Sequence, residues 1–137
     1  MNGRKYCFII IVAALLIVAM SGCSVEEEPG ISFIDWGNHD LRAEQVVTAL
    51  LNGDFTRVAE GFDDDMSSAI DVRGLRKAWR DTVRIAGSFY VIDRTEISAH
   101  DGYEIYDVVS LHANRNINTR VVFSADDKIA GLFFTFI

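Results

Sequence analysis

The sequence predicts an α+β fold in which three N-terminal helices pack on a four-stranded antiparallel meander. Two observations carry this prediction. The last fifty residues, 88 to 137, read as four consecutive strands that short turns connect. Residues 40 to 86 contain three segments whose apolar residues recur at helical spacing. A chain of 137 residues has room for one such domain, and we expect it at residues 39 to 137.

The N-terminal segment has the composition of a signal peptide. Residues 1 to 5 carry two positive charges, and residues 6 to 20 form an unbroken, mostly aliphatic run. A membrane-spanning helix needs roughly 20 apolar residues, so this run is short for an anchor and suits a cleaved leader.

The end of that run, Met20-Ser21-Gly22-Cys23, resembles the lipobox of bacterial lipoproteins. The resemblance implies a lipoprotein signal peptide at residues 1 to 22 and fatty acyl groups such as palmitate on Cys23. It also implies an extracytoplasmic protein of the cell envelope, lipid-anchored to the cell membrane. The alternatives are ordinary cleavage near Gly22 with an incidental cysteine, or an uncleaved helix.

Cleavage before Cys23 would leave 115 residues with 11 Lys and Arg against 20 Asp and Glu, a net charge of −9. Such an acidic domain is a poor partner for nucleic acid, because that affinity depends on Lys and Arg neutralising phosphates. The other cysteine, Cys7, departs with the leader, so the mature domain has no internal disulfide. Residues 23 to 38 are predicted as a tether. Its apolar residues pack on the domain's edge or contact a partner or the membrane; they are Ile31, Phe33, Ile34 and Trp36.

Aspartates mark the starts of the predicted helices. Asp40, Asp54 and Asp71 are the expected N-caps, and Gly87 ends the third helix. The acidic run at 63–65 lacks the alternating ligands and central glycine of an EF-hand loop. We interpret that run as a cap or loop.

The third helix has an apolar and a basic stripe. The apolar residues are Val72, Leu75, Ala78, Trp79, Val83 and Ile85, and the basic ones are Arg73, Arg76, Lys77, Arg80 and Arg84. The basic stripe could hold an anionic partner, or it could balance the acidic charge of the domain. Trp79 could line a ligand pocket or pack in the core.

The first hairpin turn decides which side chains share a face of the sheet. Asp101-Gly102 is a strong hairpin signal. A two-residue loop there would place Glu96 opposite Asp107, a like-charge pair, so we predict a three-residue loop that ends with Gly102. The face predicted from this register consists of Phe89, Val91, Asp93, Thr95 and Ile97, then Ile105, Asp107, Val109 and Leu111, and then Ile117, Thr119, Val121 and Phe123.

The last strand is apolar on both faces and is expected to be covered on both. Ala130, Leu132, Phe134 and Phe136 are placed on one face, and Ile129, Phe133 and Ile137 on the other. The opposite face of the sheet is predicted to carry an association patch bordered by Arg94, Glu104, His112 and Arg120. Its apolar members are Tyr90, Ile92, Tyr106, Val108, Val122, Phe133 and Ile137. The expected partner is a second copy, giving a homodimer, or an envelope protein.

The order of elements resembles an uncharacterised family (a domain of unknown function) of exported small domains in the nuclear transport factor 2-like superfamily. The residues that carry the resemblance are 50–55, Leu75 and Trp79 before Gly87, and 127–132, and it spans about 41 to 137. It implies a cone-shaped, cystatin-like α+β fold. That superfamily includes enzymes, ligand binders and dimerisation modules, and the fold alone does not choose among them.

Two carboxylates are the candidates for chemistry. In the predicted register, Asp93 and Asp107 lie diagonally on an apolar face. Two carboxylates in an apolar hollow raise the pKa of one of them, as general acid/base catalysis requires. Alternatively, both face water or pair with Arg94 or Arg120. His39, His100 and His112 lack metal-ligand spacing, so no metal and no other cofactor is predicted.

The function expected from the sequence is a non-catalytic binding module for a small apolar ligand or a protein partner. The candidate pocket residues are Trp79, Phe89, Val109, Phe123 and Phe134. The alternative is a small acid/base enzyme, of the isomerase or dehydratase type, that uses Asp93 and Asp107.

Overall fold

The computed structural model describes residues 39 to 137, without the side chains of His39 and Asp40. The predicted signal peptide, Cys23 and the tether lie outside the described residues. The described chain runs through helices and then strands, as predicted. The helices are α2 (His39–Leu51), α3 (Phe55–Glu60), α4 (Asp64–Ala69) and α5 (Val72–Ala86), and the strands are β1 (Phe89–His100), β2 (Tyr103–His112), β3 (Ile117–Phe123) and β4 (Ile129–Phe136).

Aspartate caps explain where three of these helices begin. The Asp54 carboxylate accepts from the backbone N–H of Arg57 at 3.3 Å, and the Asp71 carboxylate accepts from that of Gly74 at 2.7 Å. Each bond satisfies a donor that has no partner within its own helix. Both predicted caps are therefore confirmed. Helix α2 is described from His39 onward, and the side chain of Asp40 lies outside the described part of the chain, so that predicted cap stays a prediction.

Helix α4 was not expected. The acidic run forms its start: Asp63 accepts from the N–H of Met66 at 2.7 Å, and Asp64 and Asp65 occupy the first turn. Negative side chains at a helix N-terminus are favoured by the helix dipole. Of the two interpretations of this run, a cap or a loop, the cap is observed, and the short helix that follows it was not predicted.

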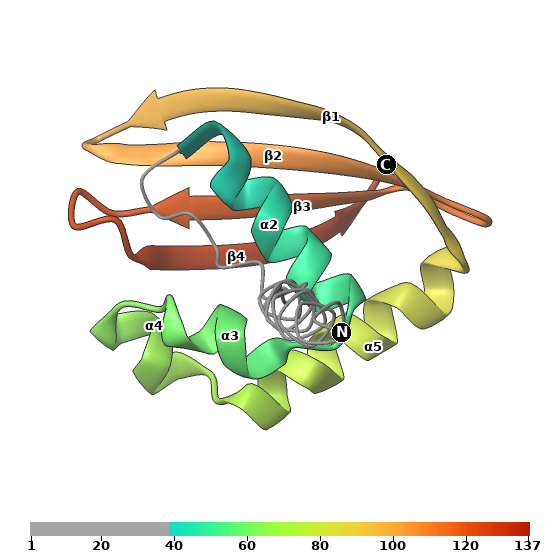
Figure 1. Cartoon of the computed structure of the whole chain (residues 1–137), viewed down its shortest axis with the longest axis horizontal. Helices are drawn as coiled ribbons and strands as arrows, with labels where there is room; N and C mark the ends of the chain where they lie inside the picture. The colour runs from blue at the N-terminus through green and yellow to red at the C-terminus, as the bar shows by residue number, and fades with distance from the viewer. Residues whose placement is uncertain (1–38) are drawn as a thin grey trace, which may run out of the picture. The chain divides into compact units, whose positions relative to one another are not determined.

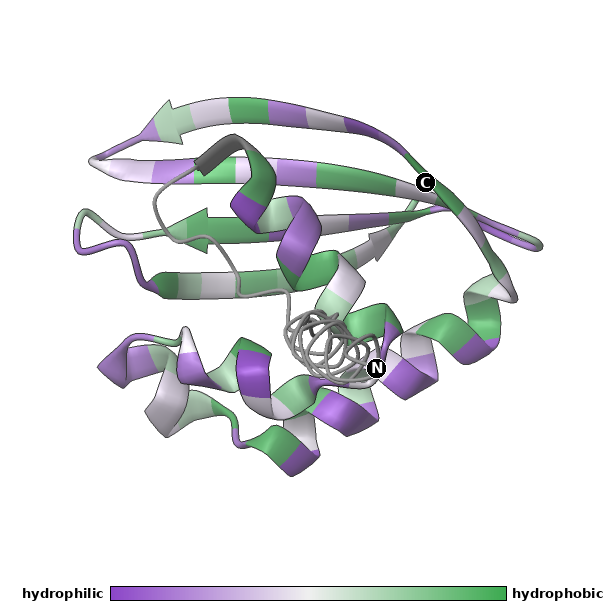
Figure 2. Cartoon of the chain, viewed as in Figure 1, coloured by the Kyte–Doolittle hydropathy of each residue, from purple (hydrophilic) through white to green (hydrophobic). Residues whose placement is uncertain are grey.

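The four strands form one antiparallel sheet in the order β1-β2-β3-β4, which confirms the predicted meander. Figure 1 shows the four helices on one side of this sheet, with α2 lying across the strands. Figure 2 shows hydrophobic and hydrophilic residues alternating along the strands and around α5, as expected for elements with one buried face.

The predicted register between β1 and β2 is wrong. The turn is the two-residue one, with His100 paired to Tyr103 and with Glu96 directly opposite Asp107. Asp101 and Gly102 have φ angles of 51° and 82°, the two positive values that a type I′ turn requires.

Neighbouring arginines explain why the like-charge pair is tolerated. Arg94 donates from Nε to Glu96 at 2.9 Å. Arg120 donates from Nε and Nη2 to Asp107 at 2.9 and 2.8 Å. Each carboxylate therefore has its own cation, which offsets the repulsion that guided the prediction.

This register reverses the predicted face of β2. Tyr106 and Val108 are buried in the core at 2% and 0% exposure, whereas Ile105, Asp107 and Leu111 lie on the face away from the helices. The prediction is correct for β3, whose Ile117, Thr119, Val121 and Phe123 are all buried. The association patch predicted for the other face is consequently not one surface: Tyr106 and Val108 belong to the core, and Val122 and Phe133 to the outer face.

Strand β4 is covered on one face. Phe134 and Phe136 pack against the core, but the Phe133 side chain is 55% exposed, so the expected cover on both faces is not found among the described residues. Ile129 is fully buried rather than outward-facing, because a register shift next to Phe123 moves it to the core side.

Candidate ligand-binding cleft

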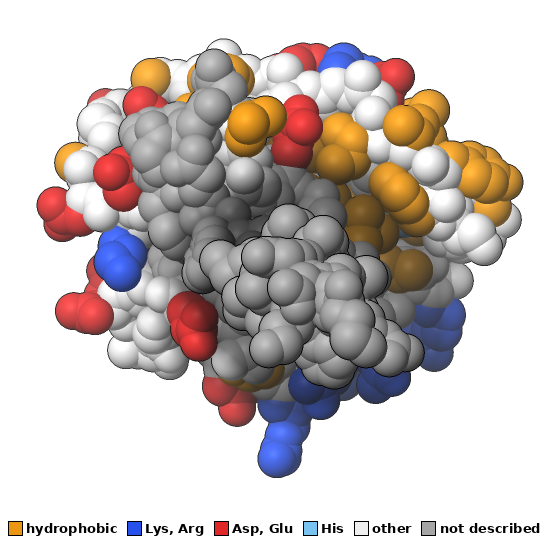
Figure 3. Space-filling view, viewed as in Figure 1, with side chains coloured by type: hydrophobic (Ala, Val, Ile, Leu, Met, Phe, Trp, Pro, Cys, Tyr) orange, Lys and Arg blue, Asp and Glu red, His pale blue; other side chains and the backbone are white. Residues whose placement is uncertain are grey.

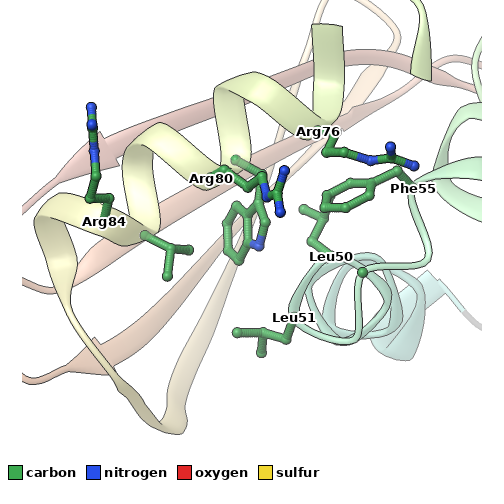
Figure 4. A pocket seen from close by; sticks show the side chains of 9 residues that line it. Leu50, Leu51, Phe55, Arg76, Arg80 and Arg84 are labelled. Atoms are coloured by element: carbon green, nitrogen blue, oxygen red, sulfur yellow. The ribbon is translucent and has the colours of Figure 1, made fainter. Parts of the chain in front are cut away.

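A cleft of about 620 Å³ opens between the C-terminal end of α2, the start of α3 and the exposed side of α5. Its size is in the range of small-molecule sites. Figure 4 shows these three elements converging on it. The lining residues are Leu50, Leu51, Gly53, Phe55, Arg76, Trp79, Arg80, Val83 and Arg84.

The floor of the cleft is apolar and packs against the sheet. Leu50, Phe55 and Trp79 are 1%, 7% and 4% exposed. The Trp79 ring also meets the Phe134 ring of β4 edge-on, with the ring centroids 5.1 Å apart. Trp79 therefore has both of the roles considered from the sequence: it packs in the core and it forms a wall of the cleft.

Guanidinium groups surround the mouth. The Arg76 guanidinium lies 5.6 Å from the centroid of the Phe55 ring, within cation–π range. In Figure 4, Arg76 and Arg80 extend toward the cleft, whereas Arg84 points away from it. Arg84 instead reaches Asp81 at 3.5 Å.

Asp81 is the acidic residue of α5, and its carboxylate forms ion pairs with two cations of the same helix. Lys77 Nζ lies 2.7 Å from its carboxylate. This hydrogen bond and the charges of Lys77 and Arg84 hold the pKa of Asp81 below its usual value. Arg76 and Arg80, which flank the cleft, are left out of this ion-pair cluster.

Comparison with known families assigns the chain to one of them. Residues 43 to 132 match the model of a protein family of unknown function, DUF3887. The chain belongs to this family. The match runs from α2 into β4, so every residue that lines the cleft lies within the DUF3887 domain. No curated protein and no solved structure matches the chain.

The DUF3887 domain does not bring the five predicted pocket residues together. Trp79 lines the cleft and Phe134 supports it from β4. Phe89 packs against the His112 ring, with the centroids 5.6 Å apart. Phe123 is buried beneath the guanidinium of Arg42, 4.0 Å from its ring. Val109 lies on the outer face of the sheet, 4% exposed.

The structural basis of the predicted Asp93–Asp107 pair is also wrong. Glu96, not Asp93, is the cross-strand neighbour of Asp107. Asp93 is exposed and lies 2.8 Å from Arg94 Nη1. Hydrogen bonds from Arg120 hold the pKa of Asp107 below its ordinary value, which is opposite to the shift that acid/base catalysis would need. The alternative pairing with Arg94 and Arg120 is the one observed.

A buried serine–histidine contact was not predicted from the sequence. Ser110 Oγ lies 3.1 Å from His112 Nε2, and His112 Nδ1 lies 3.0 Å from the carbonyl oxygen of Gly87. Because a carbonyl oxygen only accepts, Nδ1 donates to Gly87. Ser110 Oγ also donates to the carbonyl oxygen of Ile117 at 3.3 Å. Ser110 is fully buried and His112 is 5% exposed, so the contact joins β2 to the end of α5 and is out of reach of solutes.

The missed cleft residues had a partial signal in the sequence. The basic stripe of α5 contains Arg76 and Arg80, but its spacing gives no indication of which neighbour it faces. Leu50 and Phe55 follow helical patterns typical of any core.

Within residues 39 to 137, no cluster of three His, Cys, Asp or Glu side chains is arranged to hold a metal ion. None of the described helices is long and apolar enough to cross a membrane.

Proposed function

We propose that this protein is a lipid-anchored, extracytoplasmic binding module that holds a small, largely apolar ligand in the cleft between α2, α3 and α5. The observation that carries the proposal is the cleft itself: about 620 Å³, with the buried side chains of Leu50, Phe55 and Trp79 as its floor. A preformed apolar surface binds a ligand at little cost in conformational entropy.

The proposal excludes catalysis at the sites considered above. A general acid needs a raised pKa, whereas Asp107 is stabilised in its charged form by Arg120. Ser110 has a base within hydrogen-bond distance but lies in the closed core. Within residues 39 to 137, the side chains that line the cleft include no carboxylate, histidine, serine or cysteine, so they offer contacts rather than proton transfer.

The wider assignment to the nuclear transport factor 2-like superfamily is part of the same proposal. It is supported by helices that cover one side of an antiparallel meander and by the order of elements along the chain. Extracytoplasmic anchoring is supported by the sequence before Cys23. Acyl chains on Cys23 would then hold the domain at the membrane.

Calorimetric titration of octanol into the full chain, held in zwitterionic nanodiscs, tests the binding function. Empty nanodiscs serve as the blank. We expect saturable binding that Val83→Phe abolishes, because the larger side chain fills the cleft from a half-buried position. Thr56→Phe, at an exposed position of α3 outside the lining, is the matched control. Equal octanol binding by the parent chain and Val83→Phe would contradict the proposed site.

A further inference from the structure

Positive charge is concentrated on one helix of an acidic protein. The chain has a net charge of −7, with 13 Lys and Arg in total. Five of these cations lie on α5: Arg73, Arg76, Lys77, Arg80 and Arg84. Figure 3 shows basic side chains gathered along the lower edge of the molecule, where α5 runs. Such segregation creates a local positive field that the overall composition conceals.

Internal ion pairs account for only part of that charge. Asp81 binds Lys77 and Arg84 at 2.7 and 3.5 Å. Within residues 39 to 137, no carboxylate lies within ion-pair distance of Arg76 or Arg80. Arg76 stacks over Phe55, and both guanidinium groups remain exposed at the mouth of the cleft.

Arg76 and Arg80 lie beside an apolar floor, so the cleft can bind an apolar group and an anionic group at once. Resting on the binding function proposed above, we infer that its ligand is a single-chain amphiphile with an oxyanion head group. The tail lies against Leu50, Trp79 and Val83, and the head lies between Arg76 and Arg80. These arginines are four residues apart on α5, so they project from the same side of the helix.

Guanidinium groups suit this role for a geometric reason. Their planar N–H pairs match the two oxygens of a carboxylate or phosphate, and they carry their charge at every physiological pH. A neutral ligand would leave both cations without an ionic partner. A cationic head group would be repelled by the α5 stripe. The charge of the head is therefore the property that the cleft selects.

The test compares three probes that share one tail: octanoate, octanol and octylammonium. Each is titrated into the full chain in zwitterionic nanodiscs, against empty nanodiscs. We expect octanoate to bind about tenfold more tightly than octanol, in line with a charge-assisted hydrogen bond. Octylammonium is expected to bind more weakly than octanol.

The variants Arg76→Gln and Arg80→Gln separate the head-group contact from the cleft. Each is expected to weaken octanoate binding about tenfold and octanol binding by a clearly smaller factor, because octanol has no oxyanion for the guanidinium to bind. Arg73→Gln is the matched control, because Arg73 is an exposed arginine of the same helix that does not line the cleft. It removes the same charge from α5, so a general field effect would appear in it equally.

The possible outcomes distinguish this inference from the binding function beneath it. Octanol and octanoate of equal affinity, both unaffected by Arg80→Gln, would overturn the oxyanion head group and leave the apolar site intact. Arg73→Gln weakening octanoate as much as Arg80→Gln would also overturn it, since the effect would then be the field of the helix. Failure of all three probes to bind would overturn the binding function itself.

Discussion

Arg42 and its partners show how a single charged side chain can be accommodated in a core. Arg42 is fully buried, and its guanidinium lies over the Phe123 ring at 4.0 Å. It also binds the backbone carbonyl of Asp127 and lies 3.3 Å from the carboxylate of that residue. Burial lowers the pKa of Arg42, and the Asp127 charge acts in the opposite direction. This contact connects α2 to the β3–β4 turn.

Asp127→Asn is predicted to destabilise the fold by removing the charge opposite Arg42. Asn tolerates the positive φ of 59° at this position, so backbone strain does not contribute. We expect the free energy of unfolding to fall by about 1–2 kcal/mol, less than for a fully buried pair because Asp127 is half exposed. Urea denaturation measures the change. Asp126→Asn, on the same exposed turn, is the control and should stay within about 0.5 kcal/mol of the parent.

The ion pair between Asp107 and Arg120 should make the stability of the fold depend on pH. Its hydrogen bonds from Arg120 and Asn118 lower its pKa in the folded chain from an ordinary value of 3.8. A lowered folded pKa means that the stabilisation is present above 3.8 and is lost as the pH falls through the folded value. Asp107→Asn should therefore cost about 1 kcal/mol at neutral pH. Denaturation at a series of pH values should show this difference shrinking in acid, and a constant difference would contradict the ion pair.

At the scale of elements, the sequence predicted what local chemistry determines. Asp54 and Asp71 cap their helices and Gly87 ends α5, with φ 84°, because each role depends on one residue and its immediate neighbours. The faces of β3 followed from simple alternation. The register of β1 and β2 was predicted wrongly because the repulsion of Glu96 and Asp107 was counted without Arg94 and Arg120, which supply compensating charge.

Substitutions in the hairpin turn test the register of β1 and β2. Gly102 has φ 82° and open space around the position of a Cβ, so Gly102→Ala introduces backbone strain without a clash. We expect a loss of about 1–2 kcal/mol in the free energy of unfolding. Asp101→Asn should be neutral or slightly stabilising, because Asn-Gly suits a type I′ turn. Thermal and urea denaturation of both variants check this, and an unaffected Gly102→Ala would argue against the two-residue turn.

At the scale of the whole molecule, the candidate site arises from the packing of distant segments. The floor and mouth of the cleft come from residues 50 to 55 and 76 to 84, which the sequence could not place together because helical periodicity gives a face but not its neighbour. Trp79 was predicted because a large aromatic on an amphipathic helix stands out. Arg76 and Arg80 were seen as a stripe, and only the fold shows which apolar surface they border.

Attachment to the membrane is predicted at Cys23. Labelled palmitate fed to cells that express the full chain should be incorporated, and the protein should fractionate with membranes. Cys23→Ala should lose the label, because the thiol that carries the acyl group is absent. Cys7→Ala, which removes the other cysteine, should keep it. Equal labelling of the Cys23→Ala variant and the parent chain would contradict lipidation at this residue.

The emission of Trp79 tests the central claim, that the cleft binds a ligand, most directly. The chain has two tryptophans, so Trp36→Phe leaves Trp79 as the remaining indole. Because Trp79 forms a wall of the cleft, bound octanol should change the intensity of its emission in a saturable manner. Adding Val83→Phe should remove this change. An emission spectrum that stays unchanged while calorimetry reports bound octanol would place the ligand elsewhere and contradict the account.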